Sequence, residues 1–384
     1  MANTDGMALV DKYYSDYGSR ARELKASGSK VLGYLTALGP VEIITAAGAV
    51  PLRLKGNVSE PITRADAHME TIACPFIRNV FDSTLKGHFN YLDGMVMPHQ
   101  CDSTDKTANV WAYNLELPYW HFLNVPHLTD DPSVDFFTSV LGLFKGSLEK
   151  FMGREITDED LARAVEAHNE NRRVMRELYS LRRFVPPLIS GVEMMKVLVA
   201  AMSLPVDEST NLIKGVIKDV QGRAANSETT SGPRVMIIGD QIDDTAVAEI
   251  IEGAGARLVM DHISLGSKMY WPDVDATADP LVGIAERYLR KVKVPTTFVA
   301  SGDTYEENLE ARFGHIREFI TEFKVDAAIL FVYKYCDPYG FEVPAVKGFI
   351  ESTGVPVLYL EDEYSTSTLG RVKTRIEAFL EMIG

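Results

Sequence analysis

Short apolar runs alternate with amphipathic stretches along the first third of the chain. The runs at 31–35, 50–54 and 94–98 have the length and composition of buried strands. Between them, helices are predicted to begin at Pro40 and at Cys74. Such an alternation predicts a mainly parallel sheet with helices on both faces.

The middle of the chain has a helical pattern throughout. Thr157, with Asp160 three residues later, resembles a helix N-cap. Apolar residues then recur at helical spacing, and residues 157–230 contain no convincing strand. We therefore predict a helical connector, followed by a linker rich in Ser, Thr and Gly at 226–233.

A second alternation of strands and helices follows the connector. Strands are predicted at 235–239, 257–260, 297–299, 328–332 and 357–360, and helices at 245–253 and 369–383. The whole pattern predicts an α/β fold of two Rossmann-like (flavodoxin-like) parallel-sheet domains that face a central cleft. The predicted division is an N-terminal helical segment at 1–30 with one helix over 7–27, a first α/β domain at 31–156, the connector at 157–230 and a second α/β domain at 231–384.

Charge and composition exclude several classes of function. The chain has 39 basic and 54 acidic residues among 384, a formal charge of −15. That balance argues against nucleic acid or an anionic membrane surface as the main partner. No apolar run reaches the roughly 20 residues of a membrane span, and the first residues lack the pattern of a signal peptide. We therefore expect a cytoplasmic protein.

Several widespread catalytic motifs are absent from the sequence. It contains no GxxxxGK[ST] phosphate-binding loop, no GxGxxG after a strand, no HExxH and no GxSxG. The sequence therefore lacks the usual nucleotide-binding motif of an ATPase, and an ATP-driven step would require a separate protein. Arg78, Lys106 and Lys268 are expected to be ordinary surface charges, and no residue is assigned to coenzyme A.

The three cysteines occupy similar positions in the predicted fold. Cys101 and Cys336 each follow a strand, and Cys74 precedes a helix. An odd number of cysteines in such a chain argues against a disulfide framework. Because parallel sheets place ligand sites at the carboxyl ends of their strands, two facing sheets can bring all three sulfurs into one crevice. Three thiolates are one short of the four that usually hold a [4Fe–4S] cluster. The alternative is that they are small buried hydrophobic residues.

Four segments carry a family resemblance. They are PVEIITAAGAVP at 40–51, LDGMVMPHQCD at 92–102, CDPYGFEVP at 336–344 and GRVKTRIEAF at 370–379. They resemble, in the same order, motifs of the 2-hydroxyacyl-CoA dehydratase and benzoyl-CoA reductase family. The resemblance covers nearly the whole chain and is specific for the family, but not for one substrate.

The resemblance implies a subunit of an oxygen-sensitive, heterodimeric enzyme of anaerobic metabolism. The [4Fe–4S] cluster ligands would be Cys74, Cys101 and Cys336. The implied partners are a homologous second subunit, an ATP-dependent iron–sulfur activator protein that delivers one electron at very low potential, and an acyl-CoA substrate. The electron would convert the thioester into a ketyl radical, which loses the hydroxyl group in dehydratases or leads to dearomatisation in reductases.

The resemblance leaves some roles open. Glu42 is the candidate for acid–base catalysis, because its motif starts a helix near the expected crevice. The alternative is a glutamate that only stabilises the helix dipole. The first hypothesis is a 2-hydroxyacyl-CoA dehydratase subunit, and the chain's modest length resembles the smaller subunit. The alternatives are a benzoyl-CoA reductase-type subunit, an electron-relay subunit without a substrate site, and a two-lobed binding module without enzymatic activity.

Overall fold

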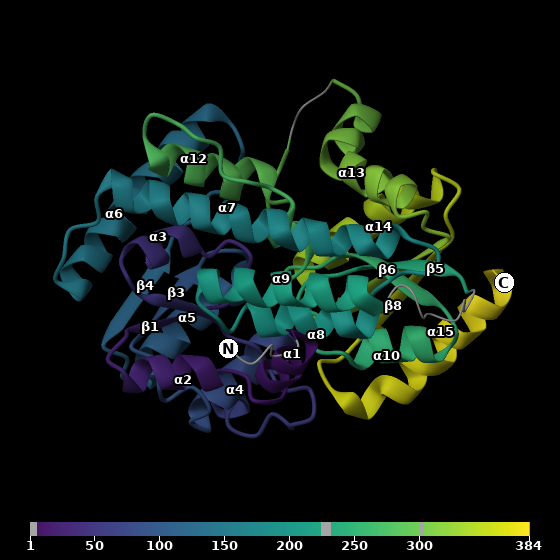
Figure 1. Ribbon diagram of the computed structural model, residues 1–384, viewed down its shortest axis with the longest axis horizontal. Helices are drawn as coiled ribbons and strands as arrows, with labels where there is room; N and C mark the ends of the chain where they lie inside the picture. The colour runs from purple at the N-terminus through teal and green to yellow at the C-terminus, as the bar shows by residue number, and fades with distance from the viewer. Residues whose placement is uncertain (1–5, 224–231, 300–302, 384) are drawn as a thin grey trace.

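Two four-stranded parallel sheets form the framework of the protein in the computed structural model (Figure 1). The structure describes residues 6–223, 232–299 and 303–383. The first sheet has the order β2-β1-β3-β4 and the second β6-β5-β7-β8, with every pairing parallel. The strands are β1 Val31–Tyr34, β2 Val50–Arg53, β3 Gly94–Pro98, β4 Tyr119–Leu123, β5 Arg234–Ile238, β6 Arg257–His262, β7 Ala327–Tyr333 and β8 Val357–Asp362. The predicted fold class is confirmed.

Helices surround both sheets and fill the space between them. The first lobe has α1 Gly6–Ser15, α2 Ser19–Ala26, α3 Val41–Ala46, α4 Pro75–Leu85, α5 Asp102–Asn114 and α6 Asp131–Met152. The second lobe has α10 Ala246–Gly253, α11 Ser267–Tyr270, α13 Tyr305–Glu322, α14 Asp337–Glu351 and α15 Leu369–Ile383. Helix α12 Pro280–Glu286 follows α11 in the chain but packs against α6 of the first lobe. Of the connecting helices, α7 Asp158–Ser180 runs across the molecule from the first lobe to the second, and α8 Gly191–Ala201 and α9 Val206–Arg223 lie in the middle of the view in Figure 1.

Two local predictions, one helix and one strand, differ from the structure, and several elements were not predicted. The helix predicted over 7–27 is two helices, because Gly18 adopts a left-handed conformation with φ of 79° between them. The strand predicted at 297–299 is wrong: Phe298 forms only an isolated bridge with Leu128. Strand β4 and helix α6 were not predicted. The linker predicted at 226–233 lies outside the described residues except for 232–233, and the predicted domain boundaries stay predictions.

Apolar packing holds the two sheets in one arrangement. A continuous core contains Leu52 and Met97 from the first sheet, Leu198 from α8, and Ile237 and Ile329 from the second sheet. Burying each such side chain contributes about 1.5–3 kcal/mol. The connecting helices therefore share one core with both sheets. In the described part of the chain, no helix is long and apolar enough to cross a membrane.

A buried carboxylate organises the loop that leads to Cys74. The side chain of Asp82, on α4, accepts hydrogen bonds from the backbone N–H groups of Thr63, Arg64 and Ala65 at 2.8, 2.5 and 2.9 Å. It also forms an ion pair with Lys86 at 2.7 Å. Burial disfavours the charged carboxylate, but Lys86 and the three N–H groups outweigh it and lower the pKa of Asp82 to about 2.

We expect Asp82→Ala to lower the free energy of unfolding by about 1–3 kcal/mol at pH 7, because three backbone N–H donors lose their acceptor and Lys86 loses its ion-pair partner. The folded-state pKa of Asp82 is depressed, so its contribution is present above about pH 4 and is lost as the pH falls toward 2. Urea unfolding at several pH values measures this. The matched control is Asp135→Ala on the exposed face of α6, which should stay within about 0.5 kcal/mol of the parent.

Candidate functional site

The three cysteines line a single pocket between the lobes. Cys74 and Cys101 come from the first lobe and Cys336 from the second. Gln100 and Asp240, which follow strands β3 and β5, complete the wall together with other residues of both lobes. The structure thus brings together side chains that are 27 and 235 positions apart in the sequence. Their function as cluster ligands stays a prediction.

Each cysteine is the residue directly before a helix. Cys74, Cys101 and Cys336 are the N-cap residues of α4, α5 and α14. Backbone N–H groups in the first turns of these helices favour the charged form of each sulfur and so act to lower its pKa: Phe76 and Ile77 for Cys74, Ser103 and Thr104 for Cys101, and Tyr339 for Cys336. Such N–H groups and the positive ends of helix dipoles stabilise negative charge on sulfur.

The three thiols hold their protons firmly as long as no cation is beside them. Burial raises the pKa of Cys74 to about 12, and proximity to Cys101 and Asp240 adds to the effect. The pKa of Cys336 is raised still further, mainly by burial and secondly by the nearby Cys74 thiol. Burial also raises the pKa of Cys101. A group that ionises all three must bring positive charge, as iron does when it binds thiolates.

The donor set fits a cluster better than a single ion. Within residues 6–223, 232–299 and 303–383, no three His, Cys, Asp or Glu side chains are arranged to hold one metal ion. A four-iron cluster does not require its cysteine sulfurs to meet at one atom, because each sulfur binds a different iron. Three partly buried thiols around one pocket therefore match the predicted three-ligand [4Fe–4S] site.

The pocket wall also carries an unused hydrogen-bond acceptor. Gln100 is buried, and its Oε1 atom has no hydrogen-bond partner among the described residues. Its Nε2 atom donates to Asp240 over 3.5 Å, and Asp240 also accepts from Gln241 at 3.3 Å and from Ser264. Buried acceptors are normally satisfied. Gln100 is therefore suited to accept a hydrogen bond from a group bound beside the cysteines.

A lysine–tyrosine pair closes one side of the pocket. Tyr339, which lines the pocket, donates its hydroxyl to the carbonyl of Gly239 at 2.5 Å. Lys268 donates to the same carbonyl at 3.0 Å and contacts the Tyr339 hydroxyl. Lys268 is only 3% exposed, so its interpretation as a surface charge is wrong. Burial lowers the pKa of Lys268. The local sequence around Lys268 contains no pattern that predicts this burial.

Glu42 lies outside the cysteine pocket. It is fully buried, forms an ion pair with Arg172 of α7 and accepts a hydrogen bond from the Tyr288 hydroxyl at 2.9 Å. Burial opposes ionisation, but Arg172, Arg287 and His168 prevail and lower the pKa of Glu42 to about 2. Glu42 is therefore a carboxylate at neutral pH. A role in acid–base catalysis stays a prediction, for which these contacts give no support.

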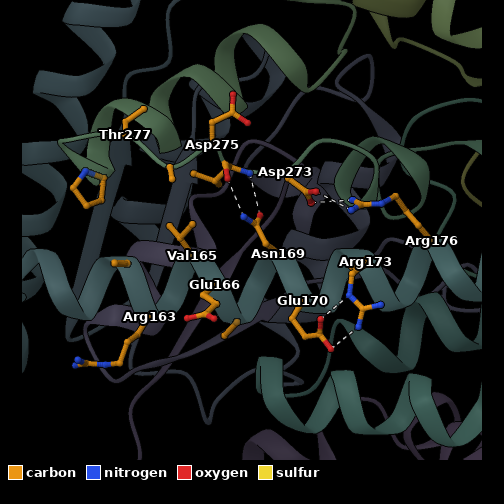
Figure 2. A pocket seen from close by; sticks show the side chains of 15 residues that line it. Arg163, Val165, Glu166, Asn169, Glu170, Arg173, Arg176, Asp273, Asp275 and Thr277 are labelled. Atoms are coloured by element: carbon orange, nitrogen blue, oxygen red, sulfur yellow. Dashed lines mark hydrogen bonds and ion pairs between the residues drawn. The ribbon is translucent and has the colours of Figure 1, made fainter.

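A groove on the outside of α7 contains none of the cysteines (Figure 2). It lies between this helix and residues 273–280. Arg176 pairs with Asp273 at 2.7 Å, Arg173 pairs with Glu170 at 2.8 Å, and Asn169 bonds to the backbone of Val274. These interactions fasten the 273–280 segment to α7, and they leave few polar groups of the groove free for chemistry.

The fold and the pocket define a two-lobed α/β protein with a three-cysteine site between its lobes. The chain belongs to the family described as 2-hydroxyglutaryl-CoA dehydratase, D-component, whose model matches residues 36–383. The predicted family is confirmed.

Similar curated proteins are subunits of enzymes. The β subunit of (R)-phenyllactyl-CoA dehydratase from Clostridium sporogenes is 24% identical, over 98% of this chain and 100% of the relative. One of the subunits of benzoyl-CoA reductase from Thauera aromatica is 23% identical, over 100% of this chain and 99% of the relative. The β subunit of (R)-2-hydroxyglutaryl-CoA dehydratase from Acidaminococcus fermentans is 25% identical, over 98% and 99%. The prediction of an enzyme of the dehydratase or reductase type is confirmed.

Proposed function

We propose that this chain is the iron–sulfur subunit of a cytoplasmic 2-hydroxyacyl-CoA dehydratase. The observation that carries the proposal is the single pocket lined by Cys74, Cys101 and Cys336. The phenyllactyl-CoA and 2-hydroxyglutaryl-CoA dehydratases among its relatives are named for 2-hydroxyacyl-CoA thioesters, which supports that substrate class.

The chain's own residues prepare the pocket for redox chemistry. A [4Fe–4S] cluster on the three cysteines would supply single-electron transfer and an iron with an open coordination position. The N–H groups at the helix N-termini oppose the effect of burial, and they would help to stabilise the thiolates once iron supplies positive charge. Gln100 would offer an acceptor to a hydroxyl group or water bound beside the cysteines. Glu42, by contrast, acts as a buried counter-ion in this proposal.

The enzyme requires two further proteins in this proposal. The three relatives are each named as one subunit of an enzyme, two of them as the β subunit, which supports a heterodimer with a homologous second subunit. The sequence has no phosphate-binding loop. The energy of ATP hydrolysis must therefore arrive from a separate activator protein, itself an iron–sulfur protein, that delivers low-potential electrons.

Dehydratase and reductase chemistry can be separated by turnover. The match to the benzoyl-CoA reductase relative along the full chain favours the reductase as the second candidate. The assay combines this chain with its partner subunit and activator, and supplies 2-hydroxyacyl-CoA esters or benzoyl-CoA. Loss of water from a 2-hydroxyacyl-CoA supports the proposal. Reduction of benzoyl-CoA alone assigns the chain to the second candidate. Turnover of neither substrate class, by a complex whose clusters accept electrons from the activator, leaves a role in electron relay.

Anaerobic isolation tests the cluster directly. We expect a brown protein with about four iron and four sulfide per chain, because three thiols and one exogenous ligand complete a cubane cluster. Iron and acid-labile sulfide are measured chemically, and the reduced cluster by electron paramagnetic resonance. A colourless, iron-free chain from strictly anaerobic, iron-supplied cells would contradict the proposal.

A further inference from the structure

A small cavity of about 50 Å³ lies where the connecting helices meet both lobes. Its lining residues include Tyr34 of β1, Arg172 of α7, Ser209 of α9, Tyr270 of α11 and Arg287, which directly follows α12. No aspartate or glutamate is among the described residues that line it. None of the cysteines lines it either, so the cavity is separate from the cysteine pocket.

Three buried hydrogen-bond donors beside this cavity have no acceptor. The Nε and Nη2 atoms of Arg287 donate to the carbonyls of Pro272 and Met269 at 2.9 and 2.7 Å, but its Nη1 atom has no partner. The hydroxyl groups of Tyr34 and Tyr270 also have no hydrogen bond within the described part of the chain. All three side chains are buried, and buried donors are normally satisfied.

Positive charge exceeds negative charge around the cavity. Glu42 forms an ion pair with Arg172 and accepts a hydrogen bond from Tyr288, whereas Arg287 bonds only to neutral carbonyls. Burial lowers the pKa of His168 to about 4, so this ring is neutral at pH 7. Two buried guanidinium groups thus share one carboxylate. Burial and the nearby Arg172 lower the pKa of Arg287, as expected for a cation without a counter-ion of its own.

The other charged groups nearby do not remove this excess. Asp273 acts on the same guanidinium but forms an ion pair with Arg176 at 2.7 Å. Arg53 adds positive potential at both tyrosine hydroxyls. Burial raises the pKa of Tyr34 to about 12 and also raises that of Tyr270, so both keep their protons at neutral pH. The tyrosines therefore supply O–H donors and no negative charge.

We propose that this cavity binds one small monovalent anion, such as chloride, through Arg287 and the hydroxyl groups of Tyr34 and Tyr270. A single negative charge balances the excess guanidinium, and the three donors supply charge-assisted hydrogen bonds. A water molecule needs about 10–15 Å³, so a cavity of about 50 Å³ admits a small ion but no nucleotide or coenzyme. The anion joins β1 of the first lobe to α11 of the second and so stabilises their arrangement.

Anomalous diffraction tests the proposal on the unchanged full chain. Crystals grown without chloride are soaked in bromide, which replaces chloride and scatters anomalously. We expect a bromide peak within hydrogen-bonding distance of Arg287 Nη1. Water at this place, in crystals that hold bromide elsewhere, would overturn the proposal.

Thermal unfolding measures the binding in solution. At constant ionic strength, replacing gluconate by chloride should raise the melting temperature by about 3 °C at about a hundred times the dissociation constant. Arg287→Met should abolish this dependence. Tyr270→Phe, a milder change that keeps the ring, should weaken chloride binding about tenfold, because a hydrogen bond to a charged group is lost.

The control is Arg375→Met, an exposed arginine of α15 that also donates to a backbone carbonyl. It should respond to chloride like the parent. A parent without chloride dependence would overturn the proposal, as would an undiminished dependence in Tyr270→Phe or in folded Arg287→Met. Neither measurement depends on iron, so the result is independent of the proposed function.

Discussion

Cys101→Ser should give a folded chain that has lost most of its iron. Serine has nearly the shape of cysteine, but its hydroxyl does not ionise as a thiol does, so one of three attachment points is removed. Changing residues that merely support metal ligands already costs 10–100-fold in affinity, and we expect a loss of at least about 100-fold here. The measurements are iron and sulfide per chain after anaerobic isolation, with circular dichroism to confirm the fold.

The matched control is Ser103→Ala, in the same turn. It keeps all three thiols and the backbone N–H that faces the Cys101 sulfur, so it should retain the parent's iron. If Cys101→Ser kept its full iron content, the ligand assignment would be wrong. The cysteines would then be better described as small buried apolar residues.

Glu42→Gln should destabilise the protein by about 3–5 kcal/mol, because it leaves Arg172 and the nearby Arg287 buried without a counter-ion. The pKa of Glu42 is lowered from its ordinary 4.5 to about 2. Its contribution is therefore complete above about pH 4.5 and is lost as the pH falls toward 2. Chemical denaturation across this range should show that Glu42→Gln lacks this part of the acid sensitivity.

Glu166→Gln is the control for this variant. Glu166 lies on the exposed face of α7, the helix that carries Arg172, and its replacement should change the stability by less than about 0.5 kcal/mol. A Glu42→Gln protein with the parent's stability but without turnover would contradict the counter-ion role. It would support the acid–base role predicted from the sequence.

The sequence predicted the central strands well because they are apolar throughout. β7 is buried at every position, as expected for a parallel strand with helices on both faces. β4, the edge strand Tyr119–Leu123, is only partly buried and contains His121, so it lacks that signature. Residues 297–299 have strand-forming composition, but only Phe298 finds a bridging partner. Strand formation depends on neighbours that local composition does not reveal.

The site was predictable in part because two of its cysteines follow these central strands. Cys101 and Cys336 follow β3 and β7, so the rule that ligands bind at the carboxyl ends of parallel strands predicted their convergence. Lys268 was wrongly predicted to be a surface charge because lysines are rarely buried without a partner, and its partners, the Gly239 carbonyl and Tyr339, are distant in the sequence. Gln100 adjoins Cys101, but nothing in the motif shows that its side-chain oxygen lacks a donor.

By itself, the sequence determined the α/β class, the family and the three candidate cysteines, because periodicity and motifs are local properties of the chain. Only the tertiary structure decided that Glu42 forms an ion pair with Arg172 and lies outside the cysteine pocket. These two residues are 130 positions apart in the sequence. The tertiary structure also decided that Lys268 is buried and contacts Tyr339, a residue of the cysteine pocket. Such relations depend on how the connecting helices pack both sheets into one core, and no local pattern encodes that packing.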